Sequence, residues 1–161
     1  MQQTGSVTEW QPGDGLDRAC RKLHCMSTDN DEIRSLVAHY FAAANARDID
    51  RVMACNALRE PSLFTYGVVL LKPFEGADAV RKDWADFFSA MKEIHLERRD
   101  LEISSDGNLG FGHFTENAVM TTNSGEQIHA VLRATHVYKK IDGQWLIIHE
   151  HKSAPATNLH P

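Results

Sequence analysis

Apolar residues recur at helical spacing in two long segments of the chain. In the first, Asp29 is a suitable N-cap and Glu32 follows three residues later, close to a capping box. The second helix of this kind is predicted over about residues 77–92, and a short helix over about 48–56 lies between the two. The apolar stripes are Ile33, Leu36, Val37, Tyr40, Phe41 and Ala44 in the first segment, and Val80, Trp84, Phe87, Phe88 and Met91 in the second.

The remaining apolar pattern is typical of strands. The run SLFTYGVVLL is rich in β-branched and aromatic residues, and four further strands are predicted over residues 95–104, 109–122, 127–141 and 144–152. Asp106-Gly107, Asn123-Ser124-Gly125 and Asp142-Gly143 separate these four as hairpin turns. The order predicts an α+β fold, in which three N-terminal helices pack on a strongly curved antiparallel sheet and leave a conical pocket.

The pattern also suggests where the domain lies. Residues 1–28 have few apolar residues and no sustained period, so they are predicted to be a flexible N-terminal extension. Residues 29–155 form the domain, and residues 156–161 form a C-terminal tail.

Composition narrows the function classes. The chain of 161 residues has a formal net charge of −5, which argues against a nucleic-acid partner because phosphate binding needs concentrated Lys and Arg. No segment approaches the length of a membrane span and no signal peptide is evident, so we expect a cytoplasmic protein without a membrane partner. Three cysteines without a Cys-x-x-Cys pair make a disulfide framework or structural zinc site an unfavoured interpretation.

The turns allow a strand register to be proposed. If Asp142-Gly143 is a two-residue turn, His149 lies opposite His136. If Ser124-Gly125 is also a two-residue turn, His113 lies opposite His136 as well, and the three histidines form one row across three strands. A three-residue Asn-Ser-Gly turn would shift the pairing by one residue and move a strand's side chains to the other face.

The same register places a second polar row on the opposite face. Glu116 would face Arg133, with Lys152 beyond it, and Glu150 would lie beside Thr135. This row is typical of cross-strand ion pairing. The acidic residues of the third helix, namely Asp78, Asp83 and Asp86, are predicted to form a solvated face.

Several segments resemble a known family. DNDEIRSLVAHYFAAANARDIDRVM, FEGADAVRKDWADFF, LEISSDGNLGFGH, RATHVYKKIDGQW and WLIIHEHKSAP are similar to the SnoaL-like family (polyketide-cyclase-like, ketosteroid-isomerase-related) of the nuclear-transport-factor-2-like superfamily. The resemblance covers roughly residues 29–155 and implies a homodimer through the sheet. The chain departs from the pattern at His136, where relatives often carry an acid, and the Tyr and Asp constellation of ketosteroid isomerases cannot be placed.

The histidines are the candidate chemistry. Imidazole titrates near neutrality, so His113 and His149 are predicted as catalytic acid–base or orienting groups, with His136 tuning them. Tyr66 and Arg133 would orient a ligand and Trp84 would form a pocket wall. The alternatives are a buried or rim position for His113, an outer-face position for His136 and His149 in a dimer interface, and a metal site, which is not favoured.

The predicted function follows from these residues and from the resemblance. The protein would be a small-molecule protein of SnoaL-like type. If it is an enzyme, it would act as an isomerase, cyclase, dehydratase or hydrolase that uses no cofactor and no metal. Its ligand would be a small apolar or aromatic molecule held in an apolar pocket. The alternatives are a non-catalytic small-molecule-binding module and a dimeric interaction domain.

Overall fold

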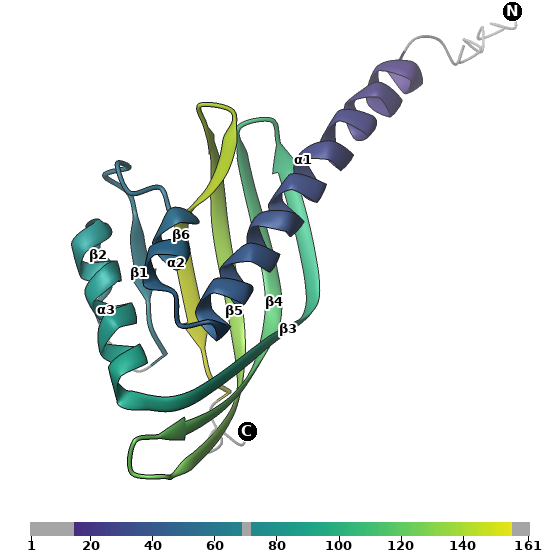
Figure 1. Ribbon diagram of the computed structural model, residues 1–161. Coiled ribbons are helices and arrows are strands. Elements are labelled where there is room, and N and C mark those ends of the chain that lie inside the picture. The colour runs from purple at the N-terminus through teal and green to yellow at the C-terminus, as the bar shows by residue number, and fades with distance from the viewer. Residues whose placement is uncertain (1–14, 69–71, 156–161) are drawn as a thin grey trace, which may run out of the picture.

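Three helices lie on one face of a curved six-stranded sheet (Figure 1). The computed structural model describes the backbone of residues 15–68 and 72–155, and the side chains of residues 29–68 and 72–155. The helices are α1 (Gly15–Asn45), α2 (Ile49–Ala54) and α3 (Gly76–Ala90). The strands are β1 (Phe64–Tyr66), β2 (Phe74–Glu75), β3 (Met91–Asp106), β4 (Leu109–Thr122), β5 (Gln127–Ile141) and β6 (Gln144–Ser153).

The α+β fold class is therefore confirmed. The strand order is β2-β1-β6-β5-β4-β3, and the four long strands form an antiparallel meander. The short strand β1 differs because it runs parallel to β6, so the sheet is mixed at this end. The sheet curves around the helices without closing into a barrel (Figure 1). We call the face that packs against the helices the inner face and the opposite one the outer face.

Helix α1 begins at Gly15, well before the N-cap predicted at Asp29. Asp29 lies within the helix and is buried, and its carboxylate accepts hydrogen bonds from Lys140 Nζ at 2.9 Å and from Trp145 Nε1 at 3.3 Å. The polar residue that suggested a cap therefore fastens α1 to the sheet. Residues 1–14 and the tail at 156–161 lie outside the described residues, and the flexible extension and the domain boundaries stay predictions.

The predicted apolar stripes form the core. From α1 the core takes Ile33, Val37, Tyr40, Phe41 and Ala44, and from α3 it takes Val80, Trp84 and Phe88. These pack against inner-face residues of the long strands, among them Leu96, Phe114, Tyr138 and Ile147. In residues 15–68 and 72–155, no helix has the length and apolar character needed to cross a membrane.

The register differs from the predicted one in both hairpins. The Asn123-Ser124-Gly125 turn holds three residues, with a hydrogen bond from the amide of Thr122 to the carbonyl of Glu126 at 2.9 Å. The β5–β6 hairpin begins as predicted with Ile141 opposite Gln144, but a bulge shifts the pairing between Tyr138–Ile147 and Val137–His149. Each difference is one residue, and each turns side chains to the opposite face.

Candidate active site

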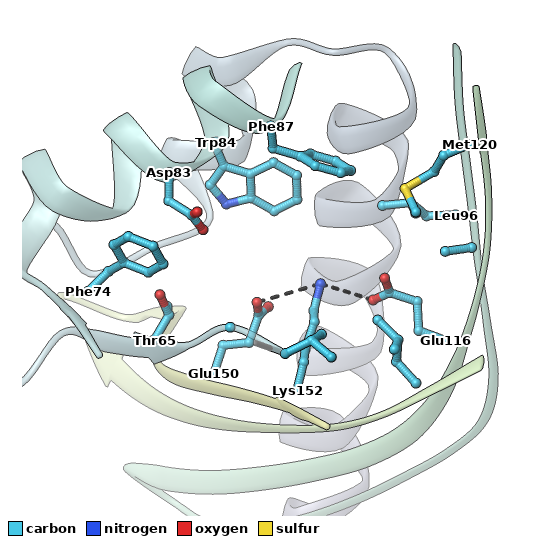
Figure 2. A pocket seen from close by; sticks show the side chains of 14 residues that line it. Thr65, Phe74, Asp83, Trp84, Phe87, Leu96, Glu116, Met120, Glu150 and Lys152 are labelled. Atoms are coloured by element: carbon cyan, nitrogen blue, oxygen red, sulfur yellow. Dashed lines mark ion pairs between the residues drawn. The ribbon is translucent and has the colours of Figure 1, made fainter. Parts of the chain in front are cut away.

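A cavity of about 280 Å³ lies between α3, β1 and the inner face of the sheet (Figure 2). Most of its wall is apolar, as is common for small-molecule sites. The apolar side chains are Val68, Phe74, Trp84, Phe87, Leu96, Ala118, Met120 and Leu132. Five polar or charged residues line it as well, namely Thr65, Asp83, Glu116, Glu150 and Lys152, and Gly67 completes the lining.

An ion-paired lysine forms the polar floor of the cavity. Lys152 Nζ lies 3.0 Å from Glu116 Oε2 and 3.5 Å from Glu150 Oε1. Figure 2 shows the ammonium between the two carboxylates, on the side of the cavity that faces Trp84 and Phe87. The ammonium also lies 5.8 Å from the Trp84 ring centroid, within cation–π range.

The bulge in β6 explains why these side chains point inward. Before the bulge, the odd-numbered residues Trp145 and Ile147 point to the inner face. The extra residue at the bulge reverses the alternation, so that even-numbered residues point inward after it. Glu150 and Lys152 are therefore placed on the inner face, while His151 is exposed on the other side.

Glu150 is held from behind by two buried aromatic groups. The Tyr40 hydroxyl donates a hydrogen bond to Glu150 Oε2 at 2.7 Å, and His136 Nε2 lies 2.7 Å from the same oxygen. His136 is fully buried, and its ring contacts those of Tyr40 and Phe114 edge-on. Burial alone would raise the pKa of Glu150, but Lys152, His136 and Tyr40 together hold it well below its usual range.

Lys152 is fixed as a cation by the same arrangement. Burial would lower the pKa of its ammonium, but the carboxylates of Glu116 and Glu150 outweigh this effect and raise the pKa above its ordinary value. The floor of the cavity therefore carries a permanent positive charge between two acidic groups.

Asp83 faces this floor from α3 and has the opposite electrostatic character. Figure 2 shows its carboxyl group directed into the cavity, toward Thr65 and Glu150. Burial and the negative charge of Glu150 raise the pKa of Asp83, and the positive charge of Lys152 offsets only part of this rise. The site thus combines a carboxyl group of raised pKa with one of lowered pKa, as in sites that separate acid and base roles.

The family model for the SnoaL-like domain matches residues 33–157 of the chain, which include every element from α2 to β6 and the C-terminal part of α1. The chain belongs to the SnoaL-like domain family. None of the curated proteins compared with it matches.

Solved structures share the fold of this SnoaL-like domain. An NTF2-like protein of unknown function from Pseudomonas putida is 27% identical, with a TM-score of 0.70, over 84% of this chain and 99% of that one. An NTF2-like superfamily protein from Salmonella enterica is 19% identical, with a TM-score of 0.74, over 83% of this chain and 95% of that one. A proposed dehydratase of the NTF2-like family from Streptomyces avermitilis is 16% identical, with a TM-score of 0.73, over 81% of this chain and 99% of that one.

The predicted row of three histidines does not form in this SnoaL-like domain. His136 faces the core opposite Glu150, whereas His113 lies opposite Thr135 with its side chain exposed on the outer face. The predicted register was wrong because the three-residue turn and the β6 bulge each shift one partner of β5.

The other predicted site residues divide between the two faces. Trp84 lines the cavity as predicted. His149 is half-buried beside β1, with Nδ1 2.9 Å from the carbonyl oxygen of Phe64, and Tyr66 packs against it on the outer side. Arg133 is exposed on the outer face, opposite Thr115 rather than Glu116. A catalytic role for His113 or His149 stays a prediction.

The prediction that Asp83 lies on a solvated face was wrong, because Asp83 lines the cavity. Glu150 and Lys152 were assigned only to a row of cross-strand ion pairs. Asp83 follows Val80 by three residues and precedes Phe87 by four, so it lies on the apolar stripe of α3. Its position on this stripe could have indicated, from the sequence, that the carboxyl group faces inward. The sequence placed Glu116 and Lys152 in one ion-pairing row but gave Glu116 the partner Arg133, whereas its partner is Lys152. The place of Lys152 in the cavity depended on a bulge with no sequence signature.

Proposed function

We propose that this SnoaL-like protein is an enzyme that transfers a proton at a carbon next to the carbonyl group of a small, largely apolar molecule. The observation that carries the proposal is that Asp83 and Lys152 line the same largely apolar cavity from α3 and β6. Asp83 is the proton acceptor, and Lys152 is the cation toward which the developing enolate charge is directed.

Asp83 suits the role of general base. A carboxylate of ordinary pKa is a weak base, and the rise caused by burial and by Glu150 brings the pKa of Asp83 closer to working pH. Its position on a helix that packs through Val80, Trp84 and Phe88 fixes the carboxyl group relative to the floor.

Lys152 suits the role of electrostatic stabiliser rather than nucleophile. Its raised pKa keeps the ammonium protonated, so the amine is not free to attack a carbonyl carbon. An ammonium has three N–H donors, and two are engaged by Glu116 and Glu150, which leaves one for the carbonyl oxygen of a ligand. His136 and Tyr40 are positioning residues that act through Glu150.

The relatives support the choice of reaction class. One structural neighbour is a proposed dehydratase, and the elimination of water from a β-hydroxy carbonyl compound begins with removal of the α proton. Isomerisation of an unsaturated ketone begins with a proton transfer of the same kind. The proposal assigns no role to His113 or His149, whose side chains do not line the cavity.

The predicted homodimer would use the outer face of the sheet. Three large apolar side chains on β4 and β5 are about half exposed there: Leu109 at 54%, Phe111 at 49% and Val131 at 55%. Such a surface supports pairing with a second copy, which the cavity itself does not require.

The test measures the rate at which deuterium replaces the protons on the α carbons of benzylacetone in D₂O. Proton NMR monitors the loss of these proton signals. We expect the wild-type protein to accelerate exchange and Asp83→Asn to lower the protein-dependent rate by about 100-fold or more, the usual contribution of a general base. Asp86→Asn is the matched control, because Asp86 lies on the same helix, is exposed and pairs with Lys82.

Equal exchange rates for wild type and Asp83→Asn would contradict the assignment of the base. Saturable binding of the ketone without accelerated exchange in any variant would instead support the alternative, a non-catalytic binding module.

A further inference from the structure

We propose that Glu116 sets the charge selectivity of the cavity, so that it admits uncharged carbonyl compounds and rejects carboxylates of the same shape. This inference rests on the proposed function, because it concerns the ligand that Lys152 and Asp83 would hold. It identifies the substrate class as neutral ketones, aldehydes or esters with a compact apolar body.

The two acidic partners of Lys152 are held very differently. Glu150 has contacts with Tyr40 and His136 in addition to Lys152. Glu116 is 2% exposed, and among the described residues its Oε2 has only the ammonium of Lys152 as an ion-pair partner, at 3.0 Å. Glu116 is the nearer of the two carboxylates to the ammonium, and it adds a second negative charge beside a lysine that Glu150 already pairs with.

The charges of the lining explain the selectivity. Its described residues carry three carboxyl groups, Asp83, Glu116 and Glu150, and a single ammonium, Lys152. An anionic ligand would enter a poorly solvated space where the cation is already paired with two carboxylates. Burial of a charge without a free counter-charge is unfavourable, whereas a neutral carbonyl oxygen needs only the one remaining N–H donor.

The apolar wall provides the rest of the ligand's surroundings. Phe74, Trp84, Phe87 and Met120 surround the space above the floor (Figure 2), and the volume of about 280 Å³ suits a body of one or two rings. Removal of the charge on Glu116 would leave this wall unchanged and pair Lys152 with Glu150 alone. A ligand carboxylate could then take the place of the missing anion.

Benzylacetone and hydrocinnamate form a matched pair of probes, because they share one skeleton and differ in an acetyl against a carboxylate group. We expect calorimetry at neutral pH to show that the wild-type protein binds the ketone at least about tenfold more tightly than the carboxylate. Glu116→Gln should shift this ratio toward the carboxylate by about tenfold or more. Glu116→Met makes the same charge change with an apolar side chain, so it replaces the first variant if Glu116→Gln does not fold.

Glu126→Gln is the control, because it removes the same formal charge from an exposed position in the β4–β5 turn. Its affinity ratio should equal that of the wild type. Equal binding of both probes by the wild type, or an unchanged ratio in a folded Glu116 variant, would overturn the inference while leaving ketone exchange by Asp83 intact. An altered ratio without any exchange activity would support the inference and contradict the proposed reaction. Failure of the wild type to bind either probe would contradict both.

Discussion

Asp83 and Glu150 show how surroundings give two carboxyl groups different properties within one cavity. Burial and a neighbouring negative charge raise the pKa of Asp83. Glu150 is also buried, but a cation and two hydrogen-bonding aromatic groups lower its pKa. Asp83 is therefore the better suited of the two to take up a proton, although both residues carry the same functional group.

The hydroxyl of Tyr40 is expected to be important for stability because it donates to a buried charge. Tyr40→Phe should lower the free energy of unfolding by about 1.5–3 kcal/mol, the range for hydrogen bonds to charged groups. Urea denaturation followed by tryptophan fluorescence measures this change.

Tyr138 offers a matched control for that substitution. Its hydroxyl is buried without a hydrogen-bond partner among the described residues. Tyr138→Phe removes the same atom and should leave stability unchanged within about 0.5 kcal/mol or increase it. A loss of stability for Tyr138→Phe as large as that for Tyr40→Phe would contradict the importance assigned to the Tyr40–Glu150 bond.

At the scale of elements, the sequence predicted the strands well and their register poorly. The spans 109–122 and 127–141 match β4 and β5, because Gly-containing turns mark their ends. The register depended on one residue in the Asn123–Gly125 turn and one at the β6 bulge. Because side chains alternate between the two faces, an error of one residue assigns all the following side chains of a strand to the wrong face. His113 and His149 were therefore predicted as partners of His136, which in fact faces Glu150.

The approach of β4 to its neighbours depends on Gly112. A Cβ added there would lie 3.0 Å from Tyr138 Oη and 3.3 Å from the carbonyl oxygen of Glu102, and the second contact is with backbone. Gly112→Ala should destabilise the fold by about 1–3 kcal/mol through overpacking, as measured by thermal unfolding.

Gly67→Ala is the control for this prediction. A Cβ at Gly67 would meet Phe74 Cε2 at 3.8 Å, an ordinary contact and the nearest one among the described residues. We expect a change within about 0.5 kcal/mol. Equal unfolding temperatures for the two variants would show that β4 can move away from Tyr138 and Glu102 at little cost.

At the scale of the whole molecule, the fold follows from patterns that repeat along the chain. Stripes such as Ile33–Ala44 and strands of alternating burial extend over many residues, so single errors do not change the fold class. The site has no such redundancy. It brings together α3, β4 and β6 through a curved sheet, and the meeting of Asp83 with Lys152 depends on long-range packing.

The central claim is that Asp83 takes up the proton, and the pH dependence of α-proton exchange in benzylacetone tests it most directly. A base must be ionised to act, so the protein-dependent rate should fall as the pH decreases through the raised pKa of Asp83, with a midpoint above the ordinary aspartate value of about 3.9. The rate should stay level on the alkaline side, because the pKa of Lys152 is raised as well.

Carbon-13 NMR titration of the Asp83 carboxyl group should give the same midpoint, and Asp83→Asn should abolish this limb of the profile. A midpoint that differs from the titration of Asp83, or a limb that persists in Asp83→Asn, would contradict the account.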